Sequence, residues 1–284
     1  MRLAFQISLL AIGLASLLGA GAASAGTLVE FPNLAGHEPA RLTGYLARPD
    51  TGFSGILGGE RGNNAPYPAV VVLHGCNGIS SHSIAIADRL GSWGYVALTV
   101  DTLGRRGLDG CYSGTYTDQA FDAYAALRYL ATLEAVDPQR IAVLGQSMGG
   151  SAALYALDRD LAARWLTERF RAGIAYYPAC AGAPMAAMSA PLLILIGEAD
   201  AWNPAEACRW LAAHARPDAE KVELVVYPGV PHAFDIVAFK PGRSLGGRWV
   251  EYDEAAAKDA EEKTRAFLDA HLVETSPTVN DELQ

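Results

Sequence analysis

The fold follows from one stretch of the sequence, Arg140-Ile141-Ala142-Val143-Leu144-Gly145-Gln146-Ser147-Met148-Gly149-Gly150, which continues into an alanine-rich segment from Ser151 to Leu157. The apolar run Ile141 to Leu144 predicts a buried parallel strand. The strand meets Gly145-x-Ser147-x-Gly149 and then a segment with helical character. A serine therefore stands at the apex of a strand–turn–helix unit, the arrangement called a nucleophile elbow. The alternative is a tight turn that carries an ordinary surface serine.

The spacing of this motif has a physical reason. A strained turn at Ser147 pushes its Oγ away from the sheet edge, and side chains at positions 145 and 149 would collide with neighbouring backbone. The helix that begins here points its N-terminal N–H groups at the same spot, where negative charge develops during acyl transfer. The stretch therefore indicates a serine nucleophile.

Length and composition fit one globular α/β domain. Of the 284 residues, 51% are hydrophobic and 19% are charged, which is enough apolar material for a substantial core. We expect this domain to cover residues 26–273, followed by a polar C-terminal tail at 274–284. The net charge of −9, with no basic cluster and interleaved aromatic residues to offset it, argues against a nucleic-acid partner.

The first 25 residues have the pattern of a secretory signal peptide. Met1-Arg2 precede a run rich in Leu, Ile and Ala to about Ala20, and Ala23-x-Ala25 predicts cleavage after Ala25. A retained membrane anchor is the alternative. However, polar residues and glycines interrupt the apolar run, and no later stretch approaches the ~20 apolar residues that span a bilayer. We therefore expect an exported protein, periplasmic or secreted, with no stable membrane insertion after signal cleavage.

Export permits disulfides, and the sequence has four cysteines: Cys76, Cys111, Cys180 and Cys208. Sequence alone allows three pairings. We favour Cys76–Cys111 and Cys180–Cys208, because each pair lies in successive loops that crowd one end of the predicted sheet. Metal binding is the alternative use of these residues, but no C-x-x-C or Cys/His spacing supports it, so we expect no metal site.

Strand-like and helix-like segments alternate along the chain. Residues 28–31 and 41–48 roughly alternate apolar and polar side chains, as edge strands do. Apolar runs predict strands at 69–73, 95–100, 141–144, 172–177 and 191–196, and residues 221–227 are the last predicted strand. Near-3.6 spacing predicts helices at 83–93, 118–133 and 255–272, and residues 49–68 read as a long loop. This order predicts an α/β fold with a mostly parallel central sheet flanked by helices.

The loop after the strand at 69–73 is the second part of the predicted site. Its sequence is His74-Gly75-Cys76, and in hydrolases of this architecture the corresponding loop supplies one oxyanion-hole N–H group. The candidate donors are therefore the backbone N–H groups of Cys76 and Met148. His74 could serve as a base, but a histidine buried at a strand end is more typical of a structural hydrogen-bonding role.

A serine hydroxyl is a poor nucleophile at neutral pH, so Ser147 needs a base, and the base needs an acid that fixes its tautomer. Functional side chains gather at the carboxyl ends of parallel strands. The downstream strands offer Asp200 and His232 there, in the order Ser, Asp, His that this architecture uses. Glu198 is a rival acid, which we place second because Asp200 lies further into the turn. Apart from His74, only His232 among the histidines follows a strand.

Three side chains are candidates for substrate contacts. Arg106, or its neighbour Arg105, follows the strand at 95–100 and could meet an anionic part of a substrate. Pairing of either arginine with a carboxylate such as Asp101 is the structural alternative. Tyr112, in the same loop, and Trp202, in the loop after the strand at 191–196, complete the set.

Four motifs in order carry a resemblance to a known family: Val72-Leu73-His74-Gly75-Cys76-Asn77-Gly78, Gly145-Gln146-Ser147-Met148-Gly149-Gly150, Gly197-Glu198-Ala199-Asp200-Ala201-Trp202-Asn203-Pro204 and Tyr227-Pro228-Gly229-Val230-Pro231-His232-Ala233-Phe234. With them the chain resembles the dienelactone hydrolase family of α/β-hydrolases over about residues 42–272. The resemblance implies the α/β-hydrolase fold, a triad at Ser147, Asp200 and His232, and no cofactor.

Two departures from that family concern the chemistry. Its characterised members use cysteine as the nucleophile, whereas Ser147 stands at that position here. They also place an arginine shortly after the catalytic histidine to bind a substrate carboxylate, and the corresponding neighbourhood, Phe234-Asp235-Ile236-Val237, has none. The family name therefore does not fix the substrate.

The sequence thus predicts a serine hydrolase that acts on a small-molecule carboxylic ester or lactone through an acyl-enzyme intermediate. Related acyl hydrolases are the alternatives among enzymes: a peptidase, a polyester hydrolase or an acetyl-xylan esterase. A non-catalytic binding protein that retains the fold is the alternative outside enzymes.

Overall fold

A computed structural model of the chain describes residues 26–49, 66–112, 115–160, 163, 167–182 and 187–273. The predicted signal peptide (1–25), most of the predicted loop at 49–68 and the polar tail (274–284) lie outside the described residues. In the part that is described, no helix has the length and apolar character needed to cross a membrane.

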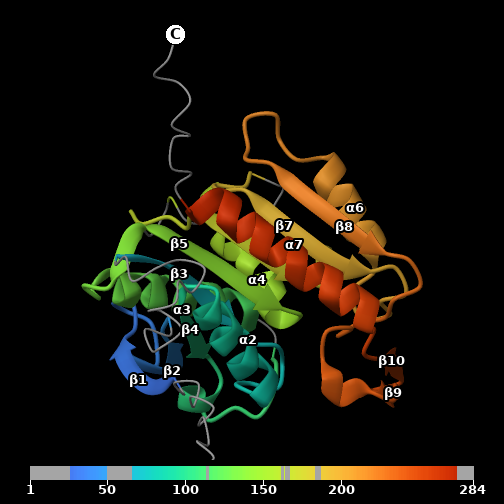
Figure 1. The fold of residues 1–284 in the computed structure, drawn as a ribbon, viewed down its shortest axis with the longest axis horizontal. Helices are drawn as coiled ribbons and strands as arrows, with labels where there is room; N and C mark the ends of the chain where they lie inside the picture. Colours follow the sequence, from blue (N-terminus) through green and yellow to red (C-terminus); the bar gives the residue numbers. More distant parts are fainter. Residues whose placement is uncertain are drawn as a thin grey trace, which may run out of the picture.

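Eight strands of the described chain form one sheet, in the order β1-β2-β4-β3-β5-β6-β7-β8 (Figure 1). They are β1 (Thr27–Pro32), β2 (Arg41–Ala47), β3 (Tyr67–Leu73), β4 (Val96–Asp101), β5 (Val136–Gln146), β6 (Ala172–Tyr176), β7 (Leu192–Gly197) and β8 (Val222–Tyr227). The β1–β2 and β2–β4 pairs are antiparallel, and the others are parallel. Strands β3 to β8 therefore end at one edge of the sheet, where functional side chains gather.

The middle of the sheet is the core of the molecule. Every residue of β3, β6 and β7 is buried, as expected for parallel strands that helices cover on both faces. The side chains of these strands are apolar on both faces of the sheet, with no alternation of apolar and polar residues. The edge strand β1 instead exposes four of its six residues. The ends of β5 and β7 lie in this buried middle, and the half-buried edge strand β8 pairs with β7 along its whole length. The ends of these three strands are therefore stable positions for a site.

Helices lie on both faces of the sheet (Figure 1). On one face are α2 (Ser81–Ser92) and α7 (Glu254–Leu272); on the other, α3 (Thr115–Ala131) packs against α4 (Met148–Ala156). A further helix, α6 (Ala205–Ala213), packs against β7 and β8. Ser80 caps α2 with a reciprocal hydrogen-bond pair to Ser83, and the Asp253 side chain caps α7.

The structure confirms the predicted fold class, and the differences are local. The strand predicted at 141–144 is longer, because β5 already pairs with β3 at Val136 and resumes the pairing at Ile141 after a register shift. A small hairpin, β9 (Arg243–Leu245) and β10 (Arg248–Val250), was not predicted; neither were the 3₁₀ turns η1 (Gly104–Arg106) and η2 (Val237–Phe239). These short elements lack the periodicity on which the predictions rest.

Two disulfides join the loops at the carboxyl edge of the sheet. Cys76 is bonded to Cys111, and Cys180 to Cys208, which is the pairing that the sequence analysis favoured. The first bond links the loop after β3 to the loop that follows η1, and the second links the loop after β6 to α6. Both bonds therefore fix a loop that follows a strand at this edge of the sheet.

Candidate active site

Ser147 stands between β5 and α4, at the apex of the predicted elbow. Its φ of 52° is positive, which is uncommon for a residue with a Cβ atom and indicates a strained turn. A Cβ atom at Gly145 would overlap the carbonyl group of Gly149, and one at Gly149 would overlap the carbonyl oxygen of Leu73. The collision predicted for side chains at positions 145 and 149 is thus present, and only glycine fits at either position.

Asp200 and His232 lie beside Ser147, although 85 residues separate the histidine from the serine. His232 Nε2 is 3.0 Å from Ser147 Oγ, and His232 Nδ1 is 2.6 Å from Asp200 Oδ2. Asp200 and His232 are both buried. The three predicted residues therefore form one hydrogen-bonded chain from hydroxyl to imidazole to carboxylate, the geometry that a serine hydrolase needs.

The carboxylate of Asp200 has a fixed orientation. The backbone N–H groups of Trp202 and Asn203 both donate to Oδ1, each at 2.8 Å, so Oδ2 faces the imidazole. Glu198, the rival acid, is half exposed and pairs with Arg209 at 3.0 Å. The carboxylate at the imidazole is thus that of Asp200.

The loops that carry Asp200 and His232 are in direct backbone contact. Ala199 donates its N–H to the carbonyl group of Val230 at 3.0 Å, and a Cβ atom at Gly197 would overlap that same carbonyl oxygen. A glycine at the end of β7 is therefore required for the two loops to approach each other. His232 is also bridged through its backbone to Val250 of β10.

Aromatic rings enclose the imidazole of His232. The Tyr177 ring meets it edge-on with centroids 4.5 Å apart, and the Trp202 ring is stacked with it at 5.9 Å. Trp202 remains 40% exposed, whereas Tyr177 is buried. Of the predicted substrate contacts, Trp202 is thus next to the base and faces solvent. The guanidinium of Arg248, from β10, stacks on its indole at 4.9 Å.

The candidate oxyanion donors lie on either side of Ser147. A Cβ atom at Gly75 would be 3.7 Å from the Cβ atom of Ser147, which puts the loop that carries Cys76 next to the serine. Met148 is the first residue of α4, so its N–H has no partner within the helix. No backbone acceptor for the Cys76 or Met148 N–H group occurs in the described ranges. Both groups therefore remain candidates for the oxyanion donors.

His74 has a structural role. It is buried, and the backbone N–H of Thr102 donates to its Nε2 at 3.2 Å, so this nitrogen carries no proton. Nδ1 lies 2.7 Å from the carbonyl oxygen of Gly75. Burial also holds the pKa of His74 below its usual value, which keeps the ring neutral. The fixed neutral ring connects the ends of β3 and β4.

Arg106 does not have the role of substrate contact that the sequence suggested. Its guanidinium holds the fully buried Asp122 of α3 through two hydrogen bonds, at 2.7 and 3.0 Å. Arg105 pairs with Glu30. Because Asp122 would be a buried unpaired charge without it, Arg106 is committed to the fold. Sequence could not identify this partner, since a near neighbour such as Asp101 is equally plausible by spacing.

Tyr112 directly follows the bonded Cys111, and its hydroxyl donates to the carboxylate of Asp118. Burial, and next the hydrogen bond to Asp118, raise the pKa of Tyr112. Cys111 Sγ lies 2.9 Å from the sulfur of Met148, so the loop that carries Tyr112 touches the first turn of α4. A contact of Tyr112 with substrate stays a prediction.

A polar network that was not predicted from the sequence lies behind the imidazole. Asp235, three residues after His232, accepts a hydrogen bond from the Tyr177 hydroxyl at 2.7 Å and another from Gln146 Nε2 at 2.7 Å. His82 Nε2 lies 3.2 Å from the same carboxylate. Position at the end of a predicted strand was the available signal for Tyr177. No pattern in the sequence predicts the contact between Asp235 and His82.

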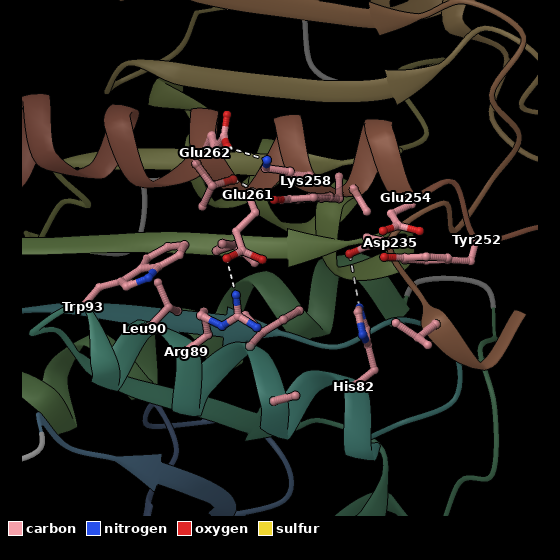
Figure 2. A pocket seen from close by; sticks show the side chains of 17 residues that line it. His82, Arg89, Leu90, Trp93, Asp235, Tyr252, Glu254, Lys258, Glu261 and Glu262 are labelled. Carbon is pink, nitrogen blue, oxygen red and sulfur yellow. Dashed lines mark hydrogen bonds and ion pairs between the residues drawn. The ribbon is translucent and has the colours of Figure 1, made fainter. Parts of the chain in front are cut away.

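A cavity of about 530 Å³ lies between α2 and α7, on the face of the sheet opposite α4. His82 and Asp235 lie at one end of it, and the Arg89–Glu261 pair spans it further along (Figure 2). Neither Ser147 nor His232 lines this cavity. In the part of the chain that is described, no group of three His, Cys, Asp or Glu side chains is placed to hold a metal ion.

The chain is similar to known proteins of the dienelactone hydrolase family. The profile of the Dienelactone hydrolase family matches residues 53–272. Among curated proteins, the "Probable 2-oxo-3-(5-oxofuran-2-ylidene)propanoate lactonase" of Bradyrhizobium sp is 28% identical over 212 residues, which cover 67% of this chain and 77% of the relative.

Solved structures share the fold at low sequence identity. A dienelactone hydrolase-like promiscuous phosphotriesterase from metagenomic libraries has a TM-score of 0.64 at 17% identity, over 87% of this chain and 99% of its own. A thermophilic esterase of Thermogutta terrifontis with bound propionate has a TM-score of 0.63 at 19% identity, over 89% of this chain and 98% of its own.

Proposed function

The chain belongs to the dienelactone hydrolase family, and on that premise we propose that it is an exported serine hydrolase that cleaves carboxylic esters or lactones. The observation that carries the proposal is the continuous contact from Ser147 Oγ to His232 Nε2 at 3.0 Å and from His232 Nδ1 to Asp200 Oδ2 at 2.6 Å. The name of the Bradyrhizobium relative, a lactonase, and that of the Thermogutta protein, an esterase, support the reaction class.

In the first half-reaction, Ser147 Oγ attacks the ester carbonyl carbon while His232 Nε2 takes the hydroxyl proton. The N–H groups of Cys76 and Met148 hold the oxyanion of the tetrahedral intermediate. His232 then returns the proton to the leaving alkoxide, which departs as the alcohol and leaves the acyl group on Ser147. For a lactone, the alcohol stays attached to the acyl chain.

In the second half-reaction, water takes the place of the alcohol. His232 removes a proton from the water as it attacks the acyl carbonyl, and then returns that proton to Ser147 Oγ when the carboxylic acid leaves. Asp200 keeps the proton of the imidazole on Nδ1 and stabilises the imidazolium in both halves. Because Asp200 Oδ1 is held by two backbone N–H groups, this carboxylate is preorganised.

The rim of the site favours a substrate with an anionic group. Arg248 is exposed and stacks on Trp202, which is stacked with His232, so a positive charge lies one ring away from the base. The ion pairs found among the described residues do not include Arg248, whose guanidinium lies over the Trp202 ring. The name of the Bradyrhizobium relative includes a propanoate, which agrees with such a charge. We therefore assign Arg248 and Trp202 to substrate binding.

Export is the second part of the proposal. The Ala23-x-Ala25 signal and the two disulfides support an oxidising compartment. Expression with residues 1–25 present should give exported material that begins at residue 26 and has no free thiol by mass mapping. Four free thiols in exported material would contradict the two proposed disulfides.

Purified protein tested on short-chain p-nitrophenyl esters and simple lactones decides between hydrolysis and binding. We expect wild-type turnover that Ser147→Ala abolishes, and incubation with paraoxon should leave one diethyl phosphate on the peptide that contains Ser147. Absence of turnover, or equal turnover by Ser147→Ala, would favour a binding protein. Faster cleavage of peptides, polyesters or acetylated xylan than of small esters would favour the corresponding alternative enzyme.

A further inference from the structure

Three non-glycine residues in the described part of the chain have positive φ, and all three lie around the proposed base. They are Ser147 (φ 52°), Tyr177 (φ 38°) and Ala233 (φ 60°). Such a conformation persists only where surrounding contacts enforce it, and it is concentrated at functional sites. Ser147 is the proposed nucleophile and Ala233 follows the base, but the reaction described above gives Tyr177 no role.

Tyr177 is held from four directions. Its N–H donates to the carbonyl oxygen of Leu195 at 2.7 Å, and its carbonyl oxygen accepts from Asn203 Nδ2 at 2.8 Å. Its hydroxyl donates to Asp235 Oδ1 at 2.7 Å, and its ring meets the imidazole of His232 edge-on at 4.5 Å. These contacts fix a fully buried ring against the base.

Asp235 anchors this arrangement as an ionised carboxylate. Its side chain is only 12% exposed; Gln146 donates to Oδ2 at 2.7 Å, and His82 Nε2 faces the same oxygen (Figure 2). Burial alone would raise the pKa of Asp235. Hydrogen bonds, that with His82 first and that from Tyr177 after it, outweigh burial and hold the pKa below its usual value. Since Gln146 directly precedes Ser147, one carboxylate fixes both the neighbour of the nucleophile and the ring against the base.

We propose that Tyr177 is a positioning residue for His232, and that Asp235 holds Tyr177 in the position this requires; the inference rests on the proposed function. The imidazole must keep Nε2 at the serine and Nδ1 at the carboxylate while its charge changes. Trp202 encloses the ring from the exposed side, and Tyr177 encloses it from the buried side. Without the anchored tyrosine ring, the imidazole gains freedom to rotate away from Ser147 Oγ.

Kinetics of Tyr177→Phe and Asp235→Asn on p-nitrophenyl acetate test this positioning. Each variant should lower kcat about 10–100-fold, the size of effect that a small misplacement of a catalytic group causes, with KM within about threefold of wild type. Both changes weaken the same hydrogen bond from Tyr177 to Asp235, the first by removing the donor and the second by removing the charge of the acceptor. The double variant should therefore be no slower than the slower single variant. Tyr124→Phe is the matched control, since it removes another buried tyrosine hydroxyl, bonded to the carbonyl group of Ala156 at 2.7 Å. It should keep wild-type kcat.

A spectroscopic measurement separates this inference from the proposed function. The Nδ1 proton of His232, in its short hydrogen bond to Asp200, should give a downfield NMR signal that is absent in His232→Gln. Tyr177→Phe and Asp235→Asn should broaden or shift this signal, whereas Tyr124→Phe should leave it unchanged. If wild-type protein hydrolyses no ester, the proposed function fails, and the NMR signal still decides the positioning.

Two results would overturn the positioning role. The first is folded Tyr177→Phe and Asp235→Asn protein with wild-type kcat and an unchanged downfield signal. The second is a loss that falls entirely in KM, because that would make Tyr177 a contact for substrate. Circular dichroism and melting curves establish that each variant is folded, and Asp235→Asn keeps the test decisive if Tyr177→Phe does not fold.

Discussion

His232 Nδ1 lies 2.6 Å from Asp200 Oδ2, and no freedom is left to the carboxylate because its other oxygen accepts two backbone N–H groups. Asp200→Asn would place an amide at this point and favour the wrong tautomer of the imidazole. If Asp200 is the acid of a triad, we expect kcat to fall about 10⁴-fold with little change in KM, as for the same change in a serine protease. Steady-state kinetics on p-nitrophenyl acetate measure it.

Glu198→Gln is the control for this prediction, because Glu198 was the rival acid and lies two residues away. It pairs with Arg209 on the surface, so its loss should change kcat less than twofold and stability by about 0–1 kcal/mol. A large loss in Glu198→Gln together with an active Asp200→Asn would reverse the assignment of the acid.

The two disulfides should differ in their effect on kcat. Loss of Cys76–Cys111 should lower both stability and kcat, whereas loss of Cys180–Cys208 should lower mainly stability. They span 35 and 28 residues, so removal of either should cost a similar amount, about 3–4 kcal/mol by the chain-entropy estimate. Only Cys76–Cys111 fixes a residue whose N–H is a candidate oxyanion donor. The Cys76→Ser/Cys111→Ser variant should therefore lose about tenfold or more in kcat, as a loosened oxyanion hole does.

The Cys180→Ser/Cys208→Ser variant is the matched control for this comparison. The measurements are the melting temperatures of the two double variants and their kcat at a temperature below both unfolding transitions. Equal losses of kcat in the two variants would show that the first disulfide has no particular connection to the oxyanion hole.

Arg248 should govern selectivity for charged esters. If its guanidinium meets an anionic group of the substrate, Arg248→Ala should lower kcat/KM for an ester with a free carboxylate about tenfold, as loss of a hydrogen bond to a charged group costs ~1.5 kcal/mol. Neutral esters of the same length should be unaffected. Arg243→Ala, on the other strand of the hairpin and stacked on Phe239 at 4.7 Å, is the control. A uniform change for charged and neutral esters in Arg248→Ala would remove the anionic-substrate assignment.

The low pKa of Asp235 predicts a pH dependence of stability. Its folded-state pKa lies below the unfolded value of ~3.9, so the ionised carboxylate stabilises the fold. This contribution is complete above pH ~4 and is lost as the pH falls through the folded-state value. Asp235→Asn should therefore be less stable than wild type by about 1–3 kcal/mol at pH 7, and the difference should shrink at pH 3. Urea unfolding at both pH values measures it, and a difference that grows at pH 3 would contradict this reading.

Much of the site could be predicted because its parts follow the ends of parallel strands. His74, Ser147 and Asp200 follow buried strand ends, and His232 follows the half-buried edge strand β8, so the parallel order of the sheet brings these residues together. Sequence order then distinguishes nucleophile, acid and base. These predictions depend on local pattern and on topology, and both can be read along the chain.

The contacts that could not be predicted from the sequence join side chains that are distant along the chain. Arg106 pairs with Asp122 because helix α3 packs against that loop, and Asp235 meets His82 only because α2 lies on that face of the sheet. Arg248 reaches the site on a hairpin of three-residue strands, too short to show a periodic pattern. Each case needs the packed structure, since no spacing rule relates the partners.

The left-handed backbone conformation of Ser147 lowers the stability of the protein at the residue on which its proposed activity depends. Its φ of 52° and ψ of −111° suit glycine, and a side chain there costs ~1–3 kcal/mol. Ser147→Gly should therefore melt at a higher temperature than Ser147→Ala, which keeps the Cβ atom, although both lack the hydroxyl. Differential scanning calorimetry of the two inactive variants measures this difference, and equal melting temperatures would mean that the turn is relaxed. If Ser147 is the nucleophile, as proposed, the side chain that catalysis requires lowers the stability of the protein, so selection for stability alone would favour its replacement by glycine.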